Sequence, residues 1–263
     1  MKVPLPTKYD IPYPDKNKKY YNQNNKKELS QIFTNITKHC MFCGKLLGAD
    51  GELYVHLDHS VDKGGNLNQK HSNSMLLHCK YNFTLSCMNC NIIYKKQVEK
   101  LDFSKYSLVK KCPTNCINLC PTYQKMRRDY CEKNAIILPP FGYIRNGVEY
   151  KIRYNLLRHV YEADMDEAEE IDIFFVEYHI MRFHLNAERF THNVIDLCVD
   201  ICDLYEMGCH TTERILNHIA EKIQPNIIGE EYIKFLKEFF IYKDAKEMVN
   251  YCKLLVILDM AVS

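Results

Sequence analysis

The chain has 263 residues, of which 46% are hydrophobic and 26% are charged; this composition excludes a disordered protein and suffices for one large core or two small ones. The formal net charge of +2 conceals a division, because residues 1–130 hold 21 Lys and Arg against 10 Asp and Glu, whereas residues 131–263 hold 14 against 23. A basic half favours a polyanion and an acidic half repels one, so we expect a nucleic-acid-facing module joined to a part with another role. Solvated surface faces are the plainer explanation of the same charge runs.

The first 30 residues are polar and rich in Lys, Asn, Tyr and Pro. They contain neither the apolar run of a signal peptide nor the length of apolar sequence that a membrane span requires. We interpret residues 1–30 as an N-terminal arm and expect a cytoplasmic protein that does not enter a membrane. The 13 cysteines agree with this location, because a reducing compartment keeps thiols free and their spacings are typical of metal ligands.

Two cysteine pairs give the strongest signal in the sequence. The stretch "CMFCG" supplies Cys40 and Cys43, and "SCMNCN" supplies Cys87 and Cys90. Two residues separate the members of each pair, so each pair can form a tight turn whose thiolates bind one ion, and two such turns complete a tetrahedron around Zn²⁺. A site with four protein thiolates is closed, which predicts a structural zinc rather than one that activates water. Four unrelated core cysteines are the alternative.

The residues between the cysteine pairs carry the candidate chemistry. They contain "ELYVHLDHS", which alternates as a strand does, and then "DKGGNLN", which is typical of a turn. The strand ends in Asp58, an oxygen ligand suited to Mg²⁺, and His59, whose side chain can take a proton near neutral pH. After the second pair, "CNIIYKKQVEK" predicts a helix with Asn91 in its first turn. Together these groups favour phosphodiester hydrolysis.

Each candidate side chain has a role that its chemistry supports. His59 would accept a proton from the attacking water, and Asn82 would orient the imidazole. Asp58 and Asn91 would hold a catalytic Mg²⁺ or Mn²⁺, which neutralises charge at the reacting phosphorus. His56 shares a strand face with Asp58 and is either an additional ligand or a packing residue. Three lysines would contact backbone phosphates without reading sequence: Lys63, Lys95 and Lys96.

Residues 38–98 resemble the HNH nuclease family, whose members carry a C-x2-C pair, a strand ending in Asp-His, a central Asn five residues before a second C-x2-C pair, and His or Asn directly after it. The matching elements here are Cys40/Cys43, Asp58-His59, Asn82 and Cys87/Cys90-Asn91. The resemblance implies a ββα-metal finger, in which a β-hairpin and a helix hold one catalytic metal ion, and an endonuclease that cleaves DNA. Asn91 stands where many members have His, and Tyr94 stands where the usual lysine lies, with Lys95 following.

A second cysteine group lies in residues 111–140, which we interpret as a Cys-rich linker. Cys112, Cys116 and Cys120 are four residues apart and Cys131 lies further on, but two prolines interrupt any regular helix and no C-x2-C pair occurs. Buried thiols are therefore the main interpretation, and a second zinc site is the alternative.

The rest of the chain, residues 141–263, predicts a β-hairpin followed by helices. Asn146-Gly147 separates two alternating segments in "FGYIRNGVEYKIRYN", which is a strong hairpin signal. Four later segments repeat apolar residues at helical spacing: "AERFTHNVIDLCVDICDLYEMG", "TTERILNHIAEKI", "EEYIKFLKEFF" and "AKEMVNYCKLLVILDM". The predicted fold class is α+β, with a nuclease module at residues 31–110 and a helical region that packs internally or receives a partner.

The order of these parts is similar to that in the HNH proteins of Septu-type and related retron anti-phage systems, in which Leu-Asn and a long helix follow the nuclease, as Leu185-Asn186 does here. This resemblance implies an ABC-type ATPase partner, which we place on the acidic helical half. Two hypotheses follow: a divalent-metal-dependent HNH endonuclease of DNA, with RNA left open, and a non-catalytic zinc-finger adaptor that binds nucleic acid or a protein. An adaptor has no use for the Asp, His and Asn residues at these spacings, so we favour the endonuclease.

Overall fold

The structure of the protein is a computed structural model, which describes residues 2–16, 18–20, 22–49, 52–53, 56–63, 74–106, 119–155, 158, 160–165, 169–187, 193–222, 227–240 and 243–262. Helices and short strands mix along these residues, as the predicted class requires. Among them, no helix combines the length and the apolar character needed to cross a membrane.

Two short strands form the hairpin that carries the candidate chemistry. β4 (His56–His59) pairs antiparallel with β5 (Phe83–Ser86), and His59 lies opposite Phe83. A helical segment follows β5 directly, as a π-helical turn η2 (Asn89–Tyr94) and a 3-10 turn η3 (Lys95–Gln97). The predicted strand end and helical segment are therefore present, but the helix is short and irregular. We call the hairpin, the two cysteine pairs and the segment from η2 to η3 the finger.

Short elements frame the finger. α1 (Gln23–Ile36) precedes the first cysteine pair and buries one apolar face. The antiparallel strands β2 (Gly48–Ala49) and β3 (Glu52–Leu53) follow that pair, and α2 (Ser74–His78) and η1 (Lys80–Asn82) lead into β5. The turn predicted after Lys63 lies outside the described residues. Beyond the finger, η4 (Phe103–Lys105) and α3 (Pro121–Asn134) complete this part of the chain.

The N-terminal residues belong to the fold and do not form the arm that we predicted. β1 (Lys2–Leu5) pairs antiparallel with β8 (Ile152–Asn155), which also pairs with β9 (Val160–Ala163), so the sheet order is β1-β8-β9. Val3 and Leu5 are buried. Two apolar residues are too few to distinguish a strand from a loop, and the pairing partner lies far along the chain, so periodicity does not reveal this strand.

A buried lysine holds the segment after β1. The Lys80 side chain is fully buried and its ammonium donates to the carbonyl oxygen of Pro14. The Tyr13 ring lies edge-on to Tyr81, with ring centroids 4.7 Å apart. Because a buried ammonium requires acceptors, this contact ties residues 13–14 to η1.

The predicted hairpin at Asn146-Gly147 is confirmed. β6 (Ile144–Arg145) pairs antiparallel with β7 (Val148–Glu149) across these two residues. Their φ angles are 50° and 83°, so both central residues adopt the left-handed conformation that a two-residue type I′ turn requires.

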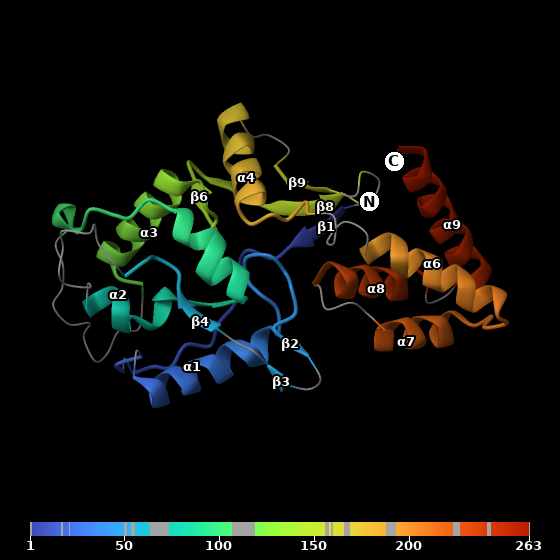
Figure 1. The fold of residues 1–263 in the computed structure, drawn as a ribbon, viewed down its shortest axis with the longest axis horizontal. Coiled ribbons are helices and arrows are strands. Elements are labelled where there is room, and N and C mark those ends of the chain that lie inside the picture. The colour runs from blue at the N-terminus through green and yellow to red at the C-terminus, as the bar shows by residue number, and fades with distance from the viewer. Residues whose placement is uncertain are drawn as a thin grey trace.

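The described part of the C-terminal half contains these helices: α4 (Glu170–Arg182), α6 (Asn193–Glu206), α7 (Thr212–Lys222), α8 (Ile227–Phe240) and α9 (Ala245–Val262). The four predicted helical segments correspond to α6–α9, and Gly208 follows α6 with a φ of 98°. Figure 1 shows α6–α9 grouped at one end of the molecule, α1 and α3 with β4 at the other, and the β1-β8-β9 sheet between them.

α8 contacts the first cysteine pair directly. The backbone amide of Ile227 donates to the carbonyl oxygen of Gly44 at 2.9 Å, and Glu230 Oε1 lies 3.1 Å from His39 Nε2. His39 is buried beside Cys40. The acidic half is therefore packed against the finger and shares a core with it.

Candidate functional site

The four predicted zinc ligands come together. The sulfur atoms of Cys40, Cys43, Cys87 and Cys90 all lie within 4.8 Å of one another, and the Cys43 and Cys87 sulfurs are 3.8 Å apart. In a tetrahedral site with Zn–S bonds of about 2.3 Å, the distance between two sulfurs is about 3.8 Å. None of the four forms a disulfide. The donor set and its spacing therefore fit one structural zinc ion.

Backbone hydrogen bonds shape both cysteine turns. The Gly44 amide donates to the Cys40 carbonyl at 2.8 Å, and Gly44 has a φ of 70°, which a side chain would disfavour. In the second turn the Asn91 amide donates to the Cys87 carbonyl at 3.0 Å. Hydrogen bonds within the group hold the pKa of the Cys87 thiol well below its usual range and raise the pKa of the Cys43 and Cys90 thiols well above theirs, so the shared hydrogen bonds favour the thiolate at Cys87.

His59 is held at the end of β4 with one ring nitrogen committed to a hydrogen bond. Its Nε2 lies 3.2 Å from the carbonyl oxygen of Leu77, and its ring lies 4.5 Å from the Phe83 ring. A carbonyl oxygen only accepts, so Nε2 carries the proton and Nδ1 of the neutral ring is the basic atom. Burial lowers the pKa of His59 to about 4, so the imidazole is neutral at pH 7.

Asp58 is paired with a lysine. The Lys95 ammonium contacts Asp58 Oδ2 and the carbonyl oxygen of His59, and the Lys95 and Asp58 side chains are 7% and 15% exposed. The four-cysteine group is the one cluster of three or more Cys, His, Asp and Glu ligands found within the described residues. A divalent ion needs several oxygen ligands with uncompensated negative charge. As folded, the Asp58 site does not fit such an ion, because Lys95 already neutralises its carboxylate.

Asn82 holds the backbone around His59, and its side-chain hydrogen bonds go to groups other than the imidazole that we expect it to orient. Its Nδ2 donates to the carbonyl oxygens of Val61 at 3.1 Å and Leu76 at 2.9 Å. Its Oδ1 accepts from the Val61 amide at 2.8 Å and from the Tyr123 hydroxyl at 3.2 Å. These bonds use both donors and both lone pairs of the amide. Asn82 thus positions the peptide next to Leu77, whose carbonyl orients His59.

The remaining predicted side chains lie on η2, η3 and the segment after β4. Asn91 is partly exposed on η2 and lies four residues before Lys95, which begins η3. Lys96 is exposed and Lys63 is partly exposed, which leaves both in reach of a polyanion. Lys95 is buried, so the phosphate contact predicted for it requires the side chain to leave Asp58.

The second cysteine group is divided by α3. The Cys120 thiol accepts from the Tyr123 amide at the start of this helix, and Cys131 is buried three turns later. At 1.5 Å per residue, eleven residues of helix separate them by about 16 Å, so they cannot bind the same ion. Cys112 and Cys116 lie outside the described residues.

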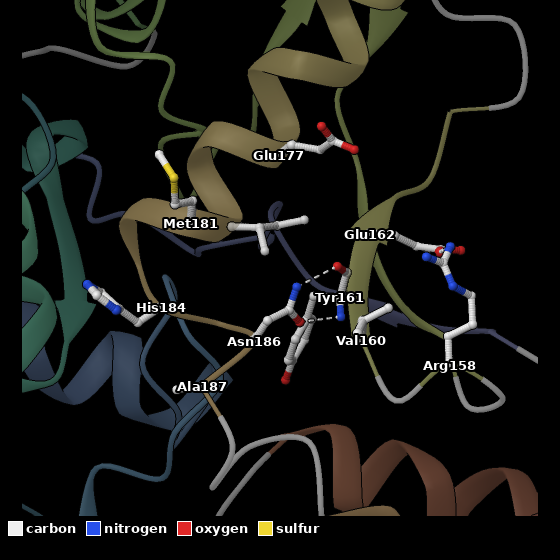
Figure 2. Close-up of a pocket in the computed structure, with 10 residues that line it drawn as sticks. Arg158, Val160, Tyr161, Glu162, Glu177, Met181, His184, Asn186 and Ala187 are labelled. Atoms are coloured by element: carbon white, nitrogen blue, oxygen red, sulfur yellow. Dashed lines mark hydrogen bonds and ion pairs between the residues drawn. The ribbon is translucent and has the colours of Figure 1, made fainter. Parts of the chain in front are cut away.

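A cavity of about 560 Å³ lies between β9 and the C-terminal turn of α4. Figure 2 shows Asn186 beside Tyr161 in this cavity, where the Asn186 amide pairs with the Tyr161 backbone amide and carbonyl at 2.6 and 3.0 Å. Glu162 is paired with Arg153 and Arg158. Asn186 of the Leu185-Asn186 signature thus satisfies backbone groups of Tyr161 on β9. Asn186 and Glu162 are therefore already engaged by groups of the protein itself.

Sequence reasoning missed the groups that complete the site. They are the Leu77 carbonyl on His59, the Tyr123 hydroxyl on Asn82 and the Phe42 ring, 6.0 Å from the Lys95 ammonium. A backbone acceptor has no side-chain signature, and the two aromatic residues reach the site through tertiary packing. No spacing in the sequence signals them.

No protein-family model matches the chain, and neither a curated protein nor a solved structure matches it. The resemblance of residues 38–98 to HNH nucleases therefore rests on the motif residues alone.

Proposed function

We propose that the chain is an HNH-type endonuclease that hydrolyses phosphodiester bonds of DNA. The observation that carries the proposal is His59, which lies at the end of the β4-β5 hairpin with its Nε2 3.2 Å from the Leu77 carbonyl. Donation from Nε2 leaves Nδ1 as the proton acceptor and stabilises the imidazolium that forms when water is deprotonated. The four-cysteine site supports this role, since it braces the hairpin against η2.

Basic residues around the finger suit a nucleic-acid substrate. Lys96 is exposed on η3, directly after the buried Lys95, and Lys63 follows β4. Residues 1–130 carry an excess of 11 basic over acidic residues, since 21 Lys and Arg face 10 Asp and Glu. Such contacts supply affinity without sequence preference.

The biological setting belongs to the same proposal. The Leu185-Asn186 resemblance supports a nuclease effector of an anti-phage defence system, with an ABC-type ATPase on the acidic helical half. That half carries 14 Lys and Arg against 23 Asp and Glu, which disfavours direct contact with DNA. The physical link through which a partner would act on the finger is the contact of α8 with Gly44.

A non-catalytic zinc-finger adaptor is the second candidate, and the low accessibility of two proposed catalytic groups favours it. Lys95 neutralises Asp58, and His59 is 6% exposed, so neither group is presented openly to a substrate. An adaptor would bind duplex DNA or a protein and leave the phosphodiester bonds intact.

Cleavage of supercoiled plasmid by the full-length, zinc-loaded chain separates the two candidates. The assay is run with Mg²⁺, with Mn²⁺ and with a chelator of divalent ions, because the sequence predicts a divalent-ion requirement. We expect nicking by the wild type and a loss of about 10²- to 10⁴-fold in His59→Ala. The matched control is His56→Ala, which removes an exposed histidine from the same strand and should retain activity. Duplex binding without nicking, at equal levels in all three proteins, would establish the adaptor.

A further inference from the structure

One face of α4 is apolar and exposed. Ile171, Phe174 and Met181 are 56%, 62% and 60% exposed, and the Tyr178 ring lies 6.2 Å from the Phe174 ring. Spacings of three, four and three residues place these four side chains, which we call the α4 stripe, on one side of the helix. The helix packs inward through its other side, where Val176 is fully buried. Several large apolar side chains exposed on one face mark an interaction surface, whereas single ones do not.

Negative charge borders the α4 stripe. Residues 160–178 contain eight acidic residues and no basic one. Some of these carboxylates are engaged inside the fold, as Asp172 is by the Tyr150 hydroxyl. Glu170 and Glu177 are exposed on α4, and neither forms an ion pair within the part of the chain that the structure describes. Each lies four residues before a member of the stripe, so the border carries charge that the fold does not neutralise.

The cavity between β9 and the end of α4 adjoins the stripe. Glu177 and Met181 line it, and Figure 2 shows both on its α4 side, with Val160 on the β9 side. A recess with apolar walls and an available carboxylate suits the aliphatic stem and the charged end of a lysine or arginine side chain.

We propose that the α4 stripe is the docking surface for a basic amphipathic helix of another protein. The apolar side of that helix would pack on Phe174 and Met181, and its Lys or Arg side chains would pair with Glu170 and Glu177. A second copy of this chain in a twofold pair would bring the same acidic border against itself, and nucleic acid would bring phosphates, so charge repulsion disfavours both. The proposal goes beyond the proposed function, because docking does not depend on cleavage of DNA.

Three labelled peptides of about 18 residues, or five helical turns, test the chemistry of the partner. The first arranges Leu and Lys as an amphipathic helix, the second has the same composition in scrambled order, and the third is amphipathic with Glu in place of Lys. Fluorescence anisotropy measures their binding to the full-length, zinc-loaded chain. We expect the amphipathic Leu-Lys peptide to bind about tenfold more tightly than the other two. Equal binding of the scrambled peptide, preference for the Leu-Glu peptide or no binding of any peptide would overturn the proposal.

Single variants test the location. Phe174→Ala should weaken binding of the amphipathic Leu-Lys peptide about tenfold, because large apolar side chains near the centre of an interface carry much of its binding energy. Glu177→Lys should also weaken it several-fold, by charge repulsion. The matched controls are Ile257→Ala, at a 61% exposed position on α9, and Glu238→Lys, at an exposed position on α8; both should bind as the wild type does. Equal effects at α4 and at the control positions would overturn the proposal.

Two further measurements identify a different occupant. Sedimentation velocity should give the same association state for the wild type and Phe174→Ala, and a wild-type dimer that Phe174→Ala dissociates would assign the stripe to a second copy. Duplex DNA should bind both proteins equally, and weaker binding by Phe174→Ala would assign the stripe to nucleic acid. Either result would overturn the proposal. None of these measurements uses cleavage, so a failure of the proposed nuclease leaves them unaffected.

Discussion

The Phe42 ring stacks on the Phe183 ring, with centroids 4.8 Å apart and 22° between the ring planes. Phe42 lies between Cys40 and Cys43, and Phe183 ends α4, so this contact joins the first cysteine turn to the C-terminal half. The pairing of β1 with β8 and the Ile227 contact with Gly44 join the same two parts of the chain. The basic and acidic halves are therefore interlocked, and their buried side chains form one continuous hydrophobic cluster.

The first prediction concerns the stability of this junction. Phe183→Ala removes a ring that is 1% exposed and should lower the free energy of unfolding by about 3–5 kcal/mol, from lost burial and the cavity left behind. The matched control is Phe174→Ala, since Phe174 is on the same helix but 62% exposed, and its removal should cost about 0.5 kcal/mol or less. Urea unfolding followed by circular dichroism measures both. Equal losses in the two variants would mean that the halves do not share this core.

The second prediction concerns the metal. Metal analysis of the folded protein should give one zinc per chain, and Cys87→Ser should lose the zinc and unfold the finger, because the binding free energy of a structural zinc contributes directly to folding. Cys209→Ser, which alters a partly exposed cysteine outside the four-cysteine group, should keep both zinc and fold. Zinc-free protein that melts at the same temperature as the wild type would show that the four cysteines form a metal-independent core.

Local spacing explains which parts of this structure could be predicted. The two C-x2-C pairs predict the turns that hold their thiols. The Asn-Gly dipeptide predicts a turn with two residues in the left-handed conformation. The apolar residues of α6–α9 repeat with the period of an α-helix. Each of these signals lies within about 20 residues, so it can be read without knowing the tertiary fold.

The parts that could not be predicted depend on distant pairings. β1 has two buried apolar residues, and the hydrogen bonds that make it a strand come from its pairing with β8. Lys95 follows Tyr94 in a polar stretch that suggests a solvent-exposed lysine, yet the fold turns it onto Asp58. Asn82 was expected to orient His59, but its four hydrogen bonds go to backbone groups and to a tyrosine on α3. In each case the sequence gives the residue type, but it does not give the distant residue with which that side chain or strand interacts.

The third prediction concerns acid stability. Burial lowers the pKa of His179 to about 3, and its Nδ1 accepts from the Ile137 amide at 3.0 Å. Because the pKa of histidine in the unfolded chain is about 6.5, the unfolded state takes up the proton first as pH falls. The stability contributed by neutral His179 is thus complete above pH 6.5 and is lost between pH 6.5 and about 3, by roughly 3 kcal/mol at pH 4.

Two variants isolate this contribution. His179→Asn keeps an acceptor for the Ile137 amide but cannot titrate, so its unfolding free energy should fall less steeply below pH 6.5 than that of the wild type. His210→Asn alters an exposed histidine and should leave the wild-type slope unchanged. Parallel pH profiles for His179→Asn and the wild type would show that His179 does not control acid stability.

The fourth prediction concerns the contribution of the Asn82 hydrogen bonds to stability. Asn82→Ala leaves the Val61 amide and the carbonyls of Val61 and Leu76 without their side-chain partner, in a site where Asn82 is fully buried, and should cost about 3 kcal/mol or more of stability. Asn91→Ala, at a partly exposed position, should cost about 0.5 kcal/mol. Thermal unfolding of both variants checks the difference. If Asn82→Ala is as stable as the wild type, the hydrogen bonds of Asn82 do not hold the segment that orients His59.

The last prediction concerns how the intact chain contacts nucleic acid. Because the halves are interlocked, the test uses full-length protein and single charge removals. Lys96→Gln should weaken duplex binding and reduce the slope of log K against log salt by about 1, since one phosphate contact releases about one counterion. The control is Lys234→Gln, which removes a 64% exposed lysine from α8 in the acidic half and should change neither quantity. Fluorescence anisotropy with a labelled duplex at several salt concentrations gives both values. An unchanged slope in Lys96→Gln, or a larger effect from Lys234→Gln, would show that nucleic acid does not contact the finger at Lys96. The basic residues would then no longer support the proposed nuclease.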